Sequence, residues 1–208
     1  MMGRTHMMFG ALFGVATCLV TKEQDPVMAF SGVTCAVVGS LLPDIDHPNS
    51  KISRSNWAIG ELSRLVSAPE WGSHRRFWHT IPASILFAGI FYVLMQIADT
   101  MVLNVIGNLT GVSISIGGYI LPLTVYLFIG SISHIFADWL NVEGSPIISP
   151  PPFKKKQHIP LIACHTGSIA EHFWKIGVSG VAIFLSYVYA REYLGMPDIT
   201  PMVERVLG

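Results

Sequence analysis

Residues 117–138 read GGYILPLTVYLFIGSISHIFAD, and no charged residue interrupts this stretch before Asp138. About 20 mostly apolar residues are enough for a helix to cross a bilayer. His134 and Asp138 close the stretch four residues apart, so they share one face of a helix. The stretch therefore predicts a membrane-spanning helix that ends in two groups able either to bind a metal or to lock the helix end by a hydrogen bond to each other.

The composition of the whole chain agrees with a membrane location. Of 208 residues 51% are hydrophobic and 12% are charged, and the mean hydropathy is +0.52. Soluble domains carry about a quarter of charged residues. Basic and acidic residues both number 13, so the net charge says nothing about partners. The length suits a single domain over residues 1–208, and the three cysteines have no paired spacing that would predict a disulfide framework.

Four further apolar stretches flank this one, which gives five in all: Met7–Val20, Val27–Leu42, Ile81–Ala98, Gly117–Ala137 and Phe173–Ala190. The last three are long enough to span a bilayer. The first two are short and predict a tilted or partly re-entrant helical hairpin that turns at Lys22–Pro26. We expect the first stretch to be retained and not cleaved as a signal, because more apolar segments follow it. The predicted fold is an all-α membrane bundle of about five transmembrane helices.

Two longer polar segments join these stretches, at residues 43–80 and 141–172. In the first, Ser55 could cap an amphipathic helix over Trp57–Val66, which we expect to lie along the membrane interface. In the second, Pro150–Pro152 favours an extended path, and Lys154–Lys156 is typical of a solvated basic run attracted to anionic lipid.

Threading five spans puts most of the positive charge on one side of the membrane. The side of the N-terminus receives ten of the 13 basic residues, and the opposite side receives only Lys22, Arg191 and Arg205. The positive-inside rule then predicts that the N-terminal side is cytoplasmic and that the C-terminus lies outside.

The same threading brings ionisable residues from distant parts of the chain to that cytoplasmic face. Each lies at a span end: His6, Asp44, Asp46, His47, His74, His79, His134, Asp138 and Glu171. Each also has a structural interpretation taken alone. Asp44 and Asp46 could be turn residues between two prolines, and Glu171 could complete a capping box with Ser168. Arg75 could be an interface anchor or could hold a phosphate.

Taken together, these residues favour a metal site. Ionisable groups near a membrane are costly unless they are paired or functional. Imidazoles and carboxylates suit a divalent metal, and we expect zinc, with manganese as the alternative. Nine candidates exceed the four ligands of one zinc ion, so one or two ions could be held, with the remaining carboxylates orienting the imidazoles.

These motifs resemble the YdjM-like family of bacterial inner-membrane proteins, described as metal-dependent hydrolases and sometimes labelled LexA-binding. The resemblance runs through Thr5-His6, residues 42–50 (LPDIDHPNS), His74-Arg75 with His79, residues 133–138 (SHIFAD), and the Gly167–Glu171 element. The chain departs from the family at Trp78, where a small hydroxyl residue is common. The histidines and the late Glu are also similar, in ligand types only, to zinc-dependent phospholipase C and nucleases.

The leading hypothesis is a membrane-bound metal-dependent hydrolase with a cytoplasmic-facing site, acting on a phosphoester of a membrane lipid or lipid-linked substrate. Asp46 or Glu171 would serve as general base, and Arg75 would hold the substrate phosphate. The alternative implied by the resemblance is a non-enzymatic regulator or scaffold that binds a DNA-damage-response repressor and holds a structural metal. A metal transporter would place its ligands at mid-membrane, whereas these lie at span ends. Nothing resembles a nucleic-acid-binding fold, so we expect no direct contact with nucleic acid.

Overall fold

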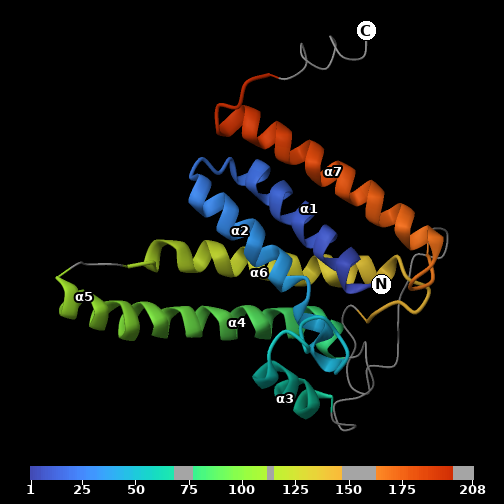
Figure 1. The fold of residues 1–208 in the computed structure, drawn as a ribbon, viewed down its shortest axis with the longest axis horizontal. Coiled ribbons are helices and arrows are strands. Elements are labelled where there is room, and N and C mark those ends of the chain that lie inside the picture. Colours follow the sequence, from blue (N-terminus) through green and yellow to red (C-terminus); the bar gives the residue numbers. More distant parts are fainter. Residues whose placement is uncertain (68–76, 112–114, 147–162, 199–208) are drawn as a thin grey trace.

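The computed structural model describes residues 1–67, 77–111, 115–146 and 163–198, and all its regular elements in these ranges are helical (Figure 1). One isolated bridge pairs Asn141 with Cys164. The elements are α1 (Gly3–Thr21), α2 (Pro26–Gly39), the 3-10 turn η1 (Leu42–Asp46), α3 (Trp57–Val66), η3 (Phe77–His79), α4 (Ile81–Ile97), the π-helical η4 (Ala98–Leu103), α5 (Asn104–Thr110), α6 (Gly117–Trp139) and α7 (Ile169–Tyr193). The predicted all-α membrane architecture is confirmed.

Four helical runs in the described ranges are long and apolar enough to cross a membrane: Pro26–Asp46, Ile81–Thr110, Gly117–Trp139 and Ile169–Tyr193. Helix α1 is not among them, so the predicted count of five spans stays a prediction. Figure 1 shows α1 and α7 lying alongside each other, with α1, η1, α4, α6 and α7 all having one end near the N-terminus of the chain.

Helices α1 and α2 form the expected hairpin. Lys22 ends α1 in the left-handed conformation, with φ 53°. The Asp25 side chain then caps α2 by accepting a hydrogen bond from the Val27 amide at 2.9 Å, and Pro26 occupies the first turn, where its missing N–H costs nothing.

Small residues let α2 pack directly on the backbone of α6. A Cβ atom on Gly39 would lie 2.2 Å from the Leu127 carbonyl oxygen, and one on Gly130 would lie 2.0 Å from the Ala36 carbonyl oxygen. Membrane helices use such residues for close approach, because dispersion contacts and not water exclusion hold them together. A hydrogen bond of 2.8 Å between the Ser84 and Ser131 hydroxyls joins α4 to α6 on another side. Helix α6 is therefore the central element of the bundle.

The structure corrects two predicted boundaries. The predicted stretch Ile81–Ala98 matches α4, but the helical run continues beyond it through η4 and α5 to Thr110. In η4 the partly exposed Asp99 carboxylate accepts a hydrogen bond from the Ile116 amide at 2.7 Å. The cap of α3 is Asn56 and not Ser55. The Asn56 side chain accepts from the Ala58 amide at 2.9 Å, while the Ser55 hydroxyl donates to the Ile52 carbonyl.

Candidate metal centre

Six of the predicted ligands meet at the end of the bundle where α1 begins. They are His6 of α1, Asp44 and Asp46 of η1, His79 of η3, and His134 and Asp138 of α6. Their side chains are almost fully buried, and Asp44 is the most accessible at 15% exposure. His74 and Arg75 lie outside the described residues. The helix ends thus bring together groups that are up to 132 residues apart, from His6 to Asp138.

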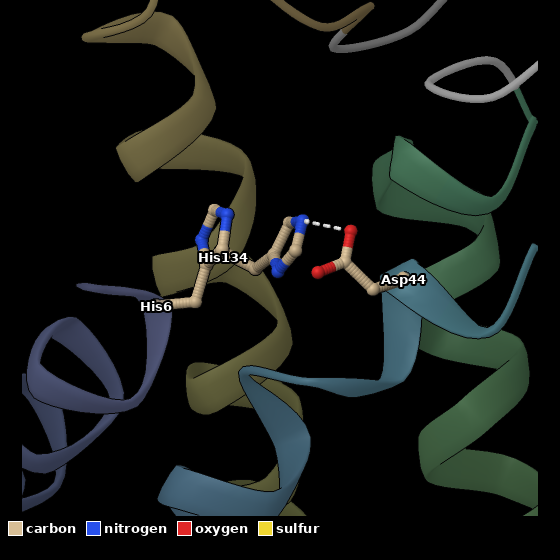
Figure 2. Close-up of side chains that lie close together, drawn as sticks. All are labelled: His6, Asp44 and His134. Atoms are coloured by element: carbon tan, nitrogen blue, oxygen red, sulfur yellow. Dashed lines mark ion pairs between the residues drawn. The ribbon is translucent and has the colours of Figure 1, made fainter. Parts of the chain in front are cut away.

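His134 is shared by the contacts of this cluster, and Figure 2 shows it between His6 and Asp44. Its Nδ1 atom lies 2.7 Å from the Ser40 carbonyl oxygen. Because a carbonyl can only accept, Nδ1 must carry a proton and donate it. The other ring nitrogen, Nε2, is buried and makes no hydrogen bond among the described residues. It faces Asp44 Oδ1 at 3.6 Å and Asp138 Oδ2 at 3.4 Å.

This arrangement fits a bound cation. In a neutral His134 ring, Nε2 would point its lone pair at two carboxylate oxygens, which is unfavourable unless a positive charge lies between them. Two ligands of one tetrahedral zinc ion lie about 3.3 Å apart, given metal–ligand distances of about 2.0–2.2 Å. The observed separations are close to that value. The bond from Nδ1 to a backbone carbonyl is also the arrangement that fixes the tautomer and orientation of metal-binding histidines.

His79 lies close to the same two carboxylates and also to Asp46. Its Nδ1 lies 2.9 Å from Asp138 Oδ2, and its Nε2 lies 3.6 Å from Asp46 Oδ1 and 4.0 Å from Asp44 Oδ1. Burial opposes the charged form of the ring, but the hydrogen bonds and charges of Asp138 and Asp46 outweigh it and raise the pKa of His79 to about 9. His79 therefore sits where a positive charge is favoured.

His6 completes the cluster from α1. Its ring stacks on that of His134, with centroids 3.7 Å apart and planes at 10°, and its Nε2 lies 3.6 Å from Asp138 Oδ1. The Met1 nitrogen lies 3.2 Å from the same carboxylate oxygen. Asp138 thus serves as the common acceptor for groups from α1, η3 and α6.

Two overlapping groups of residues could hold a metal ion: His6 with Asp44 and His134, and His79 with His134 and Asp138. Both use His134, which has only Nε2 available, and an imidazole nitrogen binds a single ion. The two groups are therefore alternative ligand sets for one ion. A second ion would need His79 with Asp46 and Asp44 as its ligands.

The structure brings His47 and Glu171 less directly to the cluster. His47 Nδ1 accepts a hydrogen bond from the Asn49 amide at 3.2 Å, at the partly exposed edge of η1. Glu171 is fully buried, but its carboxylate accepts from the Met2 amide at 2.5 Å, the Thr5 hydroxyl at 2.8 Å and the Gly167 amide at 2.7 Å. The Ser168 hydroxyl accepts from the Glu171 amide, as expected for one half of a capping box. These contacts make Glu171 a link between α7 and the first turn of α1.

A polar pocket of about 380 Å³ leads to the cluster from outside. It is lined by Met1, Met2, Gly3, Asp44, His47, Asn49, Ser50, Lys51, Glu143 and Thr166. Asp44 belongs to both the pocket and the cluster, so the cluster can be reached through this residue. A small molecule or one end of a larger one could approach here.

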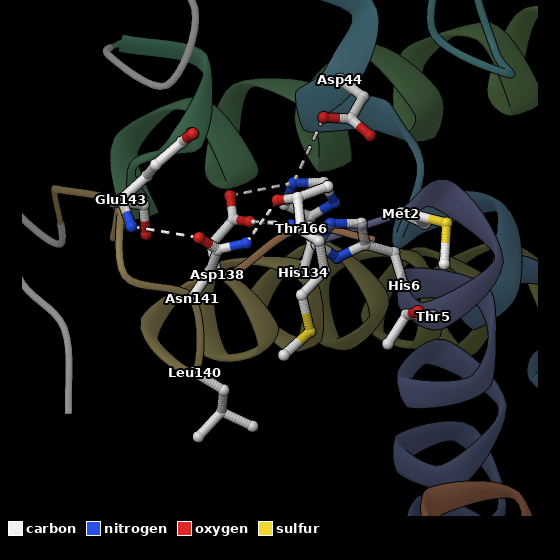
Figure 3. A network of polar contacts seen from close by, with 12 residues as sticks. Met2, Thr5, His6, Asp44, His134, Asp138, Leu140, Asn141, Glu143 and Thr166 are labelled. Atoms are coloured by element: carbon white, nitrogen blue, oxygen red, sulfur yellow. Dashed lines mark hydrogen bonds and ion pairs between the residues drawn. The ribbon is translucent and has the colours of Figure 1, made fainter. Parts of the chain in front are cut away.

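Sequence reasoning missed several residues that shape the site. The Ser40 carbonyl fixes His134, but a backbone group leaves no signal in the sequence. Asn141 donates to the Thr166 hydroxyl at 2.6 Å and accepts from the Glu143 amide at 3.0 Å, which ties the end of α6 to the loop before α7 (Figure 3). In the sequence, only the short distance of three residues between Asn141 and Asp138 indicated that Asn141 lies near the site.

Trp78 stands where the resemblance described above predicts a small hydroxyl residue. Its indole Nε1 donates to the Val66 carbonyl at 3.3 Å, and its ring stacks on Phe87 with centroids 5.6 Å apart. The large side chain therefore anchors η3, which carries His79, between α3 and α4.

The fold and the cluster together define a helical membrane protein with a buried histidine–carboxylate site that could hold a metal ion. Within that class the chain belongs to the YdjM family, since the model of the YdjM inner membrane protein family matches residues 1–196.

Two relatives illustrate the spread of this family. The inner membrane protein YdjM of Escherichia coli (strain K12) is 26% identical over 171 residues, which cover 78% of this chain and 73% of the relative. A Bacillus subtilis (strain 168) protein, named "Uncharacterized protein YvsG", is 31% identical over 192 residues, which cover 90% of this chain and 96% of the relative. No solved structure matches the chain significantly.

Proposed function

We propose that this protein is a membrane-bound, metal-dependent hydrolase that acts on a phosphoester of a lipid or lipid-linked substrate. The observation that carries the proposal is the buried Nε2 atom of His134. The ring is held by the hydrogen bond from Nδ1 to the Ser40 carbonyl, and Nε2 lies 3.6 Å from Asp44 Oδ1 and 3.4 Å from Asp138 Oδ2. Each distance is close to the separation of two ligands of one ion. We propose zinc as the ion, because the donors are imidazoles and carboxylates in a compact buried set.

A divalent ion in this position would supply Lewis-acid chemistry, polarising a phosphoryl oxygen and lowering the pKa of bound water to about 7. The residues of the chain have complementary tasks. His134 would hold the ion together with either His6 and Asp44 or His79 and Asp138, and the remaining residues of the cluster would orient these ligands. Asp46, at 3.6 Å from His79 Nε2, would accept the proton of the attacking water. Arg75, outside the described residues, would hold the phosphate.

The polar pocket supports an enzyme over a purely structural metal site. A structural zinc is closed on all sides by protein ligands, whereas a catalytic one keeps a position open. Here Asp44 lines both the cluster and the 380 Å³ pocket. The position of the cluster at the helix ends supports a substrate that is itself anchored in the bilayer.

The cytoplasmic orientation of the site belongs to the same proposal. Ten of the 13 basic residues lie on the side of the cluster in the five-span threading. Reporter fusions test this directly: a C-terminal fusion should be active as a periplasmic or external reporter. A cytoplasmic C-terminus would contradict the five-span topology.

Metal analysis of the purified protein, followed by a release assay, tests the function. Wild type should carry at least one tightly bound divalent ion per chain, and a His134→Ala/Asp138→Ala variant should carry none. Wild type should then release phosphate or a headgroup from lipid extracts, and should lose that activity with a chelator and regain it with zinc. Bound metal without turnover would instead support the regulator or scaffold, with a structural metal. Equal metal in both proteins would contradict the site.

A further inference from the structure

A groove of about 690 Å³ runs along the surface between α1 and α7, next to the candidate metal centre. It is lined by Arg4, Met7, Met8, Lys51, Lys175, Ile176, Ser179, Gly180 and Ile183. Basic residues and apolar residues thus share one surface groove. The function proposed above does not use it.

The three cations come from three separate parts of the chain. Arg4 lies in the first turn of α1, Lys51 in the loop after η1, and Lys175 in the second turn of α7. No carboxylate is among the described residues that line the groove, and neither Arg4 nor Lys175 forms an ion pair with any described residue. Lys51 has only a weak contact from its Nζ to the Met7 sulfur, at 3.6 Å. The groove therefore presents positive charge that the described protein does not neutralise.

The rest of the groove is apolar and open. Ile176 and Ile183 are 66% and 71% exposed, and they lie one below the other along α7. A Cβ atom on Gly180, between them, would meet no atom within 4 Å. Because α7 is one of the four runs able to cross a membrane, this part of the groove faces the bilayer in a membrane-spanning arrangement.

We propose that this groove binds one anionic phospholipid, with its phosphate held by Arg4, Lys51 and Lys175 and one hydrocarbon chain laid along Ile176, Gly180 and Ile183. Arginine and lysine suit phosphate oxygens, and the volume lies in the range of about 300–1,000 Å³ found for small-molecule sites. Charge complementarity selects the headgroup, and the apolar strip selects the chain.

Lys51 connects the lipid groove to the candidate site. It lines both the groove and the polar pocket that contains Asp44 and His47. A lipid phosphate bound at Lys51 would therefore lie at the entrance to the metal cluster. The lipid site does not require the hydrolase activity, but if that activity holds, the groove is where the substrate or a neighbouring lipid would be bound.

The ordinary alternative is that these cations are separate interface anchors. Lysine and arginine at helix ends commonly extend to the headgroup region without binding any one lipid. The two cases differ in stoichiometry and in dependence on shape. A built groove binds one lipid and is blocked by a side chain placed within it, whereas general attraction depends on charge alone.

Lipid titration of the full-length protein in detergent, read by native mass spectrometry, tests the proposal. The probes are dioleoyl phosphatidylglycerol, dioleoyl phosphatidylcholine with the same chains, and inorganic phosphate as competitor. Wild type should bind one phosphatidylglycerol in preference to phosphatidylcholine, and phosphate alone should displace it only weakly. The measurement is made with a chelator present, so that failure of the hydrolase proposal leaves it interpretable.

Two pairs of variants separate shape from charge. Gly180→Phe fills the groove and should weaken phosphatidylglycerol binding at least about tenfold, since it displaces several methylenes. Gly177→Phe is its matched control, because Gly177 lies on the same helix with equally open space but outside the groove. Arg4→Gln/Lys175→Gln should weaken binding roughly thirtyfold, whereas Arg54→Gln/Arg64→Gln removes the same charge elsewhere and should have little effect. Equal effects of both glycine variants, or of both charge pairs, would overturn the proposal.

Discussion

At the end of the bundle where α1 begins, three imidazoles and three carboxylates are buried together, and several of their closest N···O separations are 3.4–4.0 Å. At the other end, where α1 turns into α2, donors and acceptors are matched. Asp25 accepts from the Val27 amide at 2.9 Å and the Tyr119 hydroxyl at 2.8 Å, and the Tyr189 hydroxyl donates to the Glu23 carbonyl at 2.9 Å.

The difference separates structural polar groups from functional ones. Asp25 only caps a helix: each of its carboxylate oxygens accepts one hydrogen bond, and the side chain is partly exposed to solvent. The opposite cluster instead concentrates acceptors around ring nitrogens in a buried place, which is costly unless a cation is bound. The same helices thus end in a cap at one end and in a candidate metal centre at the other.

The largest expected effect tests how many ions that cluster holds. His6→Gln and His79→Gln each remove the histidine that is unique to one of the two groups, and the loss of a ligand should lower the affinity of that group for its ion by about 100-fold or more. If one ion is bound, the variant of the group that holds it should lose its metal and the other variant should keep it, whereas two ions would leave about half of the metal in each variant. The measurement is elemental analysis of metal per chain after dialysis.

His172→Gln is the control for this pair. His172 is exposed on α7, outside the cluster. Its replacement should leave the metal content at the wild-type value. A loss in His172→Gln similar to that in His79→Gln would show that the difference between the two ends is not one of metal binding.

A second prediction concerns the packing that positions the cluster. Gly130→Ala would drive a methyl group into the Ala36 carbonyl, a backbone atom that cannot yield without moving α2. We expect a loss of about 3 kcal/mol in stability, measured by thermal unfolding in detergent. We also expect weaker metal binding, because α2 leads to Ser40 and Asp44, which both face His134. Gly177→Ala, which meets no atom within 4 Å, should leave metal binding unchanged and should not lower the stability, because alanine favours the helix more than glycine does.

The sequence predicted the meeting of these residues better than their individual roles. Alternating spans placed His6, Asp46 and His134 at one end because helix direction depends only on the order of the apolar stretches. Local hydrogen bonds could not be predicted in this way. Both Ser55 and Asn56 are residue types that can cap α3, and the local backbone geometry decides that Asn56 does so. In the same way, the hydrogen bond from the Ile116 amide to Asp99 depends on how the backbone brings these residues together.

Glu171 is a residue whose place near the bundle end was predicted but whose role as a ligand was not supported, and a third prediction tests that role. Glu171→Gln keeps the shape but replaces one acceptor oxygen by an NH₂ group, which would face the Gly167 amide or the first turn of α1. Because hydrogen bonds to a charged group are lost, we expect a loss of about 2 kcal/mol in stability. Metal content should stay within twofold of wild type. Complete loss of metal with unchanged stability would make Glu171 a ligand instead, as the sequence alone suggested.

The smallest effect is expected at the matched end of the bundle. Asp25→Ala should lower the melting temperature by about 2–4 °C, and Asp25→Asn should lower it less, because asparagine still caps the helix but lacks the charge; neither should change the metal content. Hydrogen bonds from Tyr119 and from the Val27 amide lower the pKa of Asp25 below its usual value. A carboxyl with a lowered folded pKa stabilises the protein above its unfolded pKa and loses that contribution as the pH falls through the folded pKa. The difference between wild type and Asp25→Ala should therefore be present at neutral pH and shrink below about pH 3.9. Loss of metal in either variant would show that the two ends are coupled and would break the contrast between them.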